Sequence, residues 1–272
     1  MTFGDKTVYP VASRNDKDFL NLTDVYLDAV FHPLSIKSPL SFRQEGWHYE
    51  LDSPEDEIVY KGVVYNEMKG NYSNFQQIAF SEVVRNMFPE SYPAFDSGGD
   101  PLNIPTLTYE EFLEFHQKFY NPDNCILFLY GDIPTETQLD FLNERFMSRI
   151  EKKYNCTEDV ENGDSKLPLI KPEIAELQKL NFINESKTIK SIAPETGSTG
   201  NFVCMNWYSG INDMEKYYLS QVLSGNDSSP LDHALKEAEL GDEVSTGNFG
   251  QYSQEFFTAG IWGVKKGNEE KV

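Results

Sequence analysis

The most informative segment of the sequence is Lys61-Gly62-Val63-Val64-Tyr65-Asn66-Glu67-Met68-Lys69-Gly70. Val59 and Val63 have helical spacing, and the glycine that closes the stretch is a suitable C-terminal cap. We therefore predict a helix from about Glu57 to Lys69. On composition alone Glu67 would be an ordinary solvated helix residue, so any special role depends on the sequence around it.

Helices and strands alternate irregularly on both sides of this stretch. Spacing, capping and proline signals predict helices over residues 16–31, 75–87, 109–120, 135–149 and 214–223, and another that begins at Ser229-Pro230. The strands we expect are Cys125–Tyr130, which is apolar throughout and should be buried, a short strand near Asn181, Phe202–Tyr208 and Phe256–Val264. This mixture favours α+β layers over a Rossmann sheet.

A chain of 272 residues suggests about two domains. Residues 151–172 are charged, polar and poor in large apolar side chains, which is typical of a linker. We therefore expect one domain over residues 1–150, a linker over 151–172 and a second domain over 173–272.

Charge and composition exclude several classes of protein. The formal net charge of −21 disfavours binding to nucleic acid, whose phosphates such a surface repels. No stretch approaches the roughly 18 consecutive apolar residues of a membrane span, so we expect a soluble protein with no membrane partner. The three cysteines are far apart and odd in number, which argues against a disulfide framework and favours a reducing intracellular compartment. No targeting segment precedes the first strand-like residues, and the chain looks as if it begins inside a fold.

Local catalytic motifs are missing. The four histidines, His32, His48, His116 and His233, are too far apart for HExxH or HxxEH. His48-Tyr49-Glu50 has the HxE spacing of zinc deaminases, but their PCxxC partner is absent. No GxSxG elbow and no GxGxxG or GxxxxGK[ST] loop occurs. A complete catalytic zinc site cannot be built locally from this sequence.

The stretch around Glu67 nevertheless resembles the third-ligand helix of the presequence-protease and falcilysin branch of the insulinase/pitrilysin superfamily of zinc metallopeptidases. The flanking segments that agree with this branch, in the same order, are Tyr9–Asn15, Asp24–Phe31, Gln44–Leu51, Asp96–Pro101 and Tyr109–Gly131. Three later segments look like the second domain of that family, namely Ser228–Leu231, Leu240–Asp242 and Gly260–Val264.

The resemblance implies an α+β fold of insulinase-like α/β sandwich domains, each a mixed sheet covered by helices. It implies that Glu67 is a zinc ligand on a helix, with its carboxylate facing a cleft. The other two ligands and the general base belong to an HxxEH helix that should lie upstream of Met1, so we expect no catalytic residue here. In that family zinc activates a water molecule and polarises the scissile carbonyl. Met1, Thr2 and Phe3 are expected to end an edge strand that pairs with the substrate.

Two interpretations follow from this kinship. In the first, the chain spans the end of the zinc-site domain and the start of the second domain of a metalloendopeptidase that degrades unfolded peptides such as targeting presequences. It would then be inactive without the N-terminal and C-terminal parts of the enzyme, and the resemblance would place it in the mitochondrial matrix or a related organelle. In the second, it is a non-catalytic module that binds peptides or a partner. An unrelated α+β binding domain is a third possibility.

Overall fold

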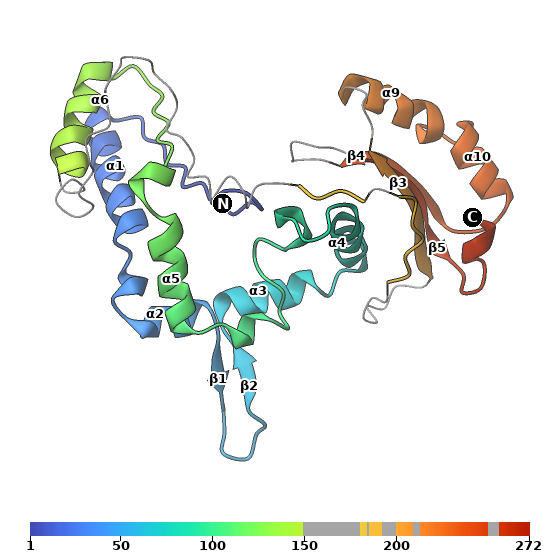
Figure 1. Ribbon diagram of the computed structural model, residues 1–272, viewed down its shortest axis with the longest axis horizontal. Helices are drawn as coiled ribbons and strands as arrows, with labels where there is room; N and C mark the ends of the chain where they lie inside the picture. Colours follow the sequence, from blue (N-terminus) through green and yellow to red (C-terminus); the bar gives the residue numbers. More distant parts are fainter. Residues whose placement is uncertain (149–179, 184, 192–199, 209–212, 250–255) are drawn as a thin grey trace. The chain divides into compact units, whose positions relative to one another are not determined.

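The computed structural model describes residues 1–148, 180–183, 185–191, 200–208, 213–249 and 256–272. The chain is α+β, as the sequence predicts (Figure 1). Within this described part, no helix is long and apolar enough to cross a membrane.

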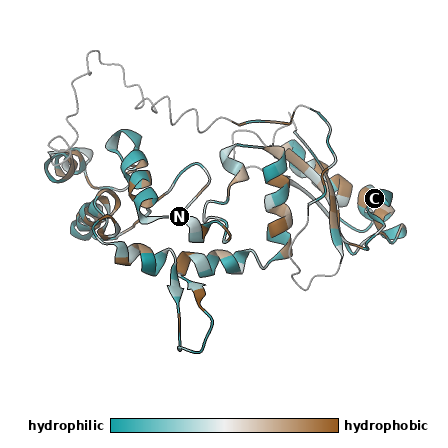
Figure 2. Cartoon of the chain, turned by 60° about the horizontal axis from the view of Figure 1, so that its bottom comes forward, coloured by the Kyte–Doolittle hydropathy of each residue, from teal (hydrophilic) through white to brown (hydrophobic). Residues whose placement is uncertain are grey.

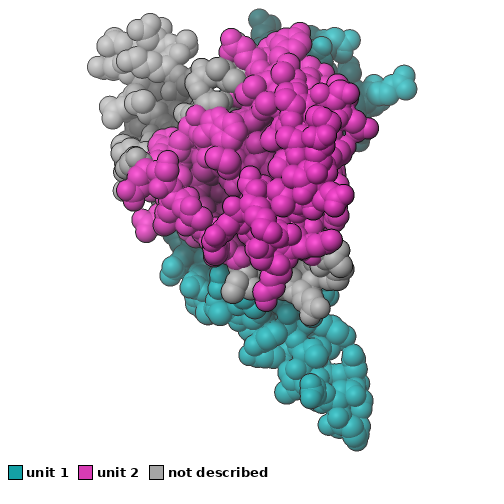
Figure 3. Space-filling model, turned by 90° about the vertical axis from the view of Figure 1, so that its right-hand side faces the viewer, with its two compact units in different colours: residues 1–69, 97–179 teal, residues 70–96, 180–272 magenta. Residues whose placement is uncertain are grey.

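Contacts between residues divide the chain into two compact units that interleave along the sequence. Unit 1 comprises residues 1–69 and 97–179, and unit 2 comprises residues 70–96 and 180–272 (Figure 3). The sequence did not indicate that residues 70–96 group with the C-terminal segment. The linker expected at residues 151–172 lies outside the described residues, so the division at that point stays a prediction.

Unit 1 is mainly helical. Its helices are α1 (Asp16–Phe31), α2 (Pro39–Glu45), α3 (Val63–Asn71, which runs past the boundary), α5 (Tyr109–Phe119) and α6 (Thr135–Leu142), which continues as a π-helical turn over Asn143–Met147. Short 3₁₀ turns cover Leu34–Ile36, Ile104–Thr106 and Pro122–Asn124. The capping box expected at the start of α5 is present, because Thr108 and Glu111 bond each other's backbone N–H groups. Phe31 packs on Phe146 with ring centroids 5.0 Å apart, which joins α1 to the end of α6.

The prediction of a helix from about Glu57 to Lys69 is wrong in its first half. Residues Val59–Lys61 form a strand, β2, that pairs antiparallel with β1 (His48–Glu50), and the helix begins only at Val63. Gly62 explains the break. It has a φ of +152°, and a Cβ at this position would collide with the backbone of Gly46. Helical spacing in the sequence therefore could not extend through this residue.

The buried strand expected at Cys125–Tyr130 is also wrong. This segment is extended but belongs to no sheet of the described residues, and Ile126, Phe128 and Tyr130 are 85%, 82% and 86% exposed. Strand pairing needs a partner, and the described part of the chain offers none at this position. The described residues near Asn181, 180–183 and 185–191, also form no strand, and the Asn181 N–H donates to the Ser91 hydroxyl at 2.6 Å.

Unit 2 contains a three-stranded antiparallel sheet in the order β3-β5-β4. Its elements are α4 (Phe75–Met87), β3 (Asn201–Tyr208), α9 (Asp213–Ser224), α10 (Pro230–Glu237), β4 (Glu243–Phe249) and β5 (Phe256–Val264), with 3₁₀ turns over Tyr92–Ala94 and Glu269–Lys271. In Figures 1 and 2, α4 lies on one side of this sheet, and α9 and α10 lie on the other. This arrangement explains why consecutive residues of the central strand β5 are buried.

The core of unit 2 joins α4 to the sheet. Val84, Met87 and Phe88 pack with Phe256 of β5, and Phe88 and Phe256 are both fully buried. The Tyr208 hydroxyl donates to the Met87 carbonyl, which ties the end of α4 to the end of β3. Residues far apart in sequence thus form one apolar cluster.

Candidate functional site

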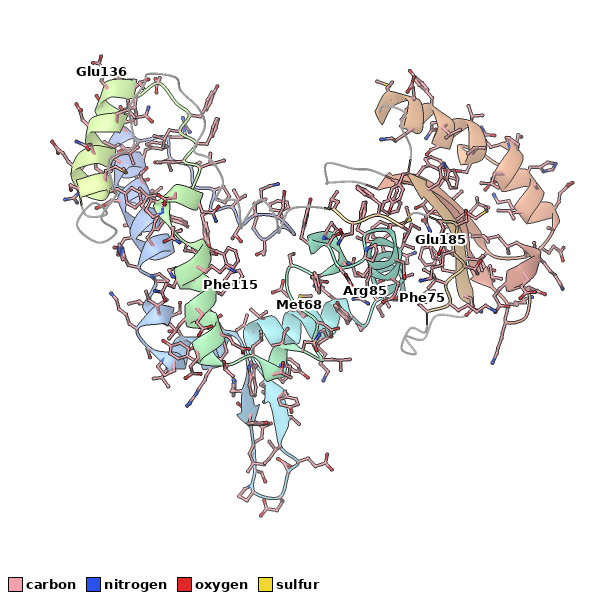
Figure 4. The ribbon with its side chains drawn as sticks, viewed as in Figure 1. Met68, Phe75, Arg85, Phe115, Glu136 and Glu185 are labelled. Atoms are coloured by element: carbon pink, nitrogen blue, oxygen red, sulfur yellow. The ribbon has the colours of Figure 1, made fainter. Side chains whose placement is uncertain are left out.

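Glu67 lies on helix α3, as predicted. The neighbouring Tyr65 and Met68 are the buried residues of this helix, and they fix which face points inward. Met68, labelled in Figure 4, occupies space that Gly98 leaves open, because a Cβ at Gly98 would collide with its sulfur. Since Tyr65 and Met68 face inward, Glu67 lies on the outer side of the helix.

The Glu67 carboxylate is exposed and has no hydrogen-bond or ion-pair partner among the described residues. We expected it to face a cleft, and the described part of the chain leaves it facing solvent. The carboxylate is thus free to take a ligand, and its role as a metal ligand stays a prediction.

The histidines are not brought together. His32 contacts Asp28 at 3.2 Å, His48 contacts Glu50 at 2.8 Å, and His116 contacts the Val30 carbonyl at 2.9 Å. Each of these three imidazoles thus contacts a different partner. Across the described residues, no group of three or more His, Cys, Asp or Glu side chains could hold a metal ion.

Met1, Thr2 and Phe3 form one arm of a small turn. Thr2 pairs antiparallel with Thr7, and Met1 and Val8 exchange both backbone hydrogen bonds at 2.8 and 2.9 Å. One side of this arm is therefore already paired within the chain. Pairing of its other side with a peptide substrate stays a prediction.

The β1–β2 hairpin, which the sequence did not reveal, has one charged face. His48 contacts Glu50 through Nε2 and the Arg43 carbonyl through Nδ1, both at 2.8 Å, while Lys61 donates to Glu50 at 3.0 Å. Both partners of the imidazole are acceptors, so the ring must carry both protons to satisfy them. Accordingly, the hydrogen bond to Glu50 raises the pKa of His48, and Lys61 lowers the pKa of Glu50.

We expect the imidazole of His48 to titrate above the ordinary value of about 6.5. Because this pKa is raised on folding, the stabilising effect is complete below about pH 6.5 and is lost as the pH rises through the raised pKa. The opposite sign holds for Glu50, whose contribution is lost as the pH falls through its lowered pKa. NMR titration of the His48 ring should show the shift, and Glu50→Gln should reduce it. A midpoint unchanged by that substitution would contradict the assignment.

Unit 1 also has a pocket of about 110 Å³ at the start of α1, lined by residues that include Arg14, Asp16, Asp132 and Gln138. Gln138 is buried and donates to the Ile133 carbonyl at 2.7 Å, while its Oε1 atom has no partner among the described residues. Glu67 does not line this pocket. No sequence motif marked it, because its residues come from two separate segments.

The family model described as "Peptidase M16 inactive domain" matches residues 106–267, which is more than half of the chain. This chain belongs to the M16 peptidase family. The sequence-based assignment to insulinase-type metallopeptidases is therefore confirmed. The part matched by the M16 model is the inactive type of domain.

Relatives of this M16 chain include presequence proteases. Protein HypA of Clostridium perfringens is 41% identical over all of the chain, and presequence protease 1, chloroplastic/mitochondrial, of Arabidopsis thaliana is 36% identical over all of it. The chain covers 27% and 24% of these two proteins, so it spans about a quarter of their length. A solved protease structure from Helicobacter pylori covers 77% of this chain and is itself 48% covered, at 15% identity and a TM-score of 0.48, too low a similarity to define a common fold.

Proposed function

We propose that this chain is part of a zinc metalloendopeptidase that degrades unfolded peptides such as targeting presequences, and that Glu67 is one of its zinc ligands. The observation that carries the proposal is the free, exposed carboxylate of Glu67 on α3, in a chain that belongs to a metallopeptidase family. The presequence proteases among the relatives of this chain suggest the substrate class.

The described residues do not by themselves fit a zinc site, because no group of three His, Cys, Asp or Glu side chains among them, around Glu67 or elsewhere, could hold a metal ion. Catalytic zinc sites use three protein ligands and leave a position for water. We therefore propose that the remaining ligands and the general base come from other parts of the enzyme. When bound, zinc would supply an activated water and polarise the scissile carbonyl.

The exposed segment Cys125–Tyr130 supports this proposal. Its side chains are apolar on both alternating faces, which is typical of a strand inside a covered sheet. We propose that this segment, which belongs to no sheet of the described residues, pairs with a part of the enzyme outside the chain, within a zinc-site domain that ends near residue 150. Residues 173–272 would then begin the second domain. The proposed compartment is intracellular, as the mitochondrial name of the Xenopus tropicalis relative suggests.

A second function, a non-catalytic module that binds peptides or a partner, is favoured by one observation. The matching family model describes an inactive domain. The two functions differ in what happens when the rest of the enzyme is supplied. A peptidase part gains zinc binding and cleavage, whereas a binding module gains neither.

We expect the 272-residue chain alone to bind zinc weakly and to cleave nothing. A single carboxylate discriminates poorly among divalent ions, and tight zinc binding requires several converging ligands. Calorimetry with zinc and a fluorogenic peptide assay would measure both properties. Stoichiometric zinc binding together with chelator-sensitive cleavage by this chain would show that the site lies elsewhere in it.

A further inference from the structure

The face of the β1–β2 hairpin opposite the charged one carries exposed apolar residues. Tyr49 and Tyr60 stand directly across from each other in the register, with ring centroids 5.2 Å apart, and they are 63% and 42% exposed. Leu51 and Ile58, next along each strand on the same side, are also exposed. We call these four residues the aromatic face of the hairpin. Figure 2 shows hydrophobic colouring on this projecting element.

The aromatic face is held in place at its base. Trp47 packs edge-on against both tyrosines, with centroids 5.5 Å from Tyr49 and 5.9 Å from Tyr60. Its indole N–H donates to the Leu107 carbonyl at 2.9 Å, which fixes the ring relative to the start of α5. Tyr60 also contacts Tyr65 of α3 at 5.9 Å. The face is thus a preorganised surface joined to the helix that carries Glu67.

The tip of the hairpin is acidic. Asp52, Glu55, Asp56 and Glu57 follow one another closely, and the one lysine of the hairpin, Lys61, is already shared between Glu50 and Asp52. The carboxylates of Asp56 and Glu57 have no hydrogen-bond or ion-pair partner among the described residues. An aromatic surface beside free carboxylates complements a side chain that has an alkyl stem and a cationic head.

We propose that the aromatic face and acidic tip of the β1–β2 hairpin bind lysine- or arginine-bearing segments of an extended, partly apolar peptide. The cationic head would pair with Asp56 or Glu57 while its stem and neighbouring apolar residues cover Tyr49 and Tyr60. This inference rests on the proposed function, since the peptide would be a substrate of the enzyme. The hairpin then selects substrates by charge at a place separate from the metal ligand.

Charge distinguishes this occupant from a second copy of the chain. Each copy carries a formal charge of −21, and two acidic tips brought together would repel each other. The same carboxylates attract a basic peptide. Its binding should therefore weaken as added salt screens their charge. Sedimentation at the concentrations of the binding assay should therefore show a monomer, and a dimer abolished by Tyr49→Ala would overturn the proposal.

The test is fluorescence anisotropy with the 272-residue chain and a labelled 12-residue peptide that alternates arginine with leucine and serine. Tyr49→Ala/Tyr60→Ala should weaken binding about fivefold or more, as should Asp56→Asn/Glu57→Gln. The matched control is Tyr217→Ala/Tyr218→Ala on α9, a contacting pair of tyrosines that are 58% and 60% exposed. This variant should bind as the parent does.

Two results would overturn the proposal. One is equal binding of a peptide with glutamate in place of arginine, and the other is equal loss of binding in the hairpin and α9 variants. Circular dichroism and a urea midpoint for each variant show whether weaker binding comes from removing the hairpin side chains or from unfolding of the protein. The binding assay contains no zinc, so a negative result in it leaves the assignment of Glu67 as a zinc ligand unaffected. Conversely, if Glu67→Gln does not change zinc binding, the result of the peptide-binding assay still holds.

Discussion

Glu67→Gln in the complete enzyme is expected to weaken zinc binding by at least about 100-fold and to reduce peptide cleavage accordingly. Loss of residues that merely orient zinc ligands costs about 10–100-fold, so loss of a ligand should cost at least as much. The amide keeps the size of the side chain but removes the charge that zinc binds. Because Glu67 has no partner among the described residues, the substitution should leave folding intact.

The measurements are zinc content after dialysis against a chelator and cleavage of a fluorogenic presequence peptide. Glu136→Gln is the matched control, since Glu136 is also an exposed helical glutamate without a hydrogen-bond or ion-pair partner among the described residues (Figure 4). It should behave as the parent enzyme. Full zinc retention by the Glu67 variant would remove Glu67 from the ligand set.

Phe88→Ala is expected to lower the free energy of unfolding by about 3–5 kcal/mol, the usual cost of emptying a phenylalanine site in a packed core. Phe88 is fully buried and contacts Phe182, Tyr208 and Phe256 with ring centroids 5.8–5.9 Å away. Its removal would leave a cavity bounded by three aromatic rings.

Urea unfolding followed by circular dichroism measures this change. Phe95→Ala is the control within the same unit, because Phe95 is 69% exposed and its loss should alter stability by no more than about 0.5 kcal/mol. Similar midpoints for the two variants would mean that the Phe88 cluster does not form in solution.

The sequence predicted correctly those elements whose ends are marked by local signals, such as a proline or a capping side chain. Helix α1 ends before Pro33, and α4 begins after Asn74, whose side chain accepts from the Gln77 N–H. Their bounds, and those of β5, agree with the prediction. The hairpin was missed because its pairing joins segments about ten residues apart, and the φ of Gly62 could not be read from helical spacing.

The candidate site could be predicted only in part. The sequence placed Glu67 on a helix, and the structure agrees. The expected strand Cys125–Tyr130 failed for a different reason, since a strand exists only when its partner is present, and none lies among the described residues. Composition favoured a solvated Glu67 and the resemblance favoured a carboxylate that faces a cleft. Among the described residues Glu67 is exposed, because Tyr65 and Met68 take the inward face of α3.

Because unit 2 combines residues 70–96 with residues 180–272, it cannot finish folding until the C-terminal segment has been synthesised. The apolar side of α4 is covered by Phe256, which leaves the ribosome about 170 residues after Phe88. At a synthesis rate of about 5–20 residues per second, α4 leaves the ribosome roughly ten to thirty seconds before Phe256 does. During that interval Val84, Met87 and Phe88 are open to chaperones and to other nascent chains. A shortened chain that stops near residue 150 would keep them open permanently, so a soluble product is better sought by retaining residues through Val264.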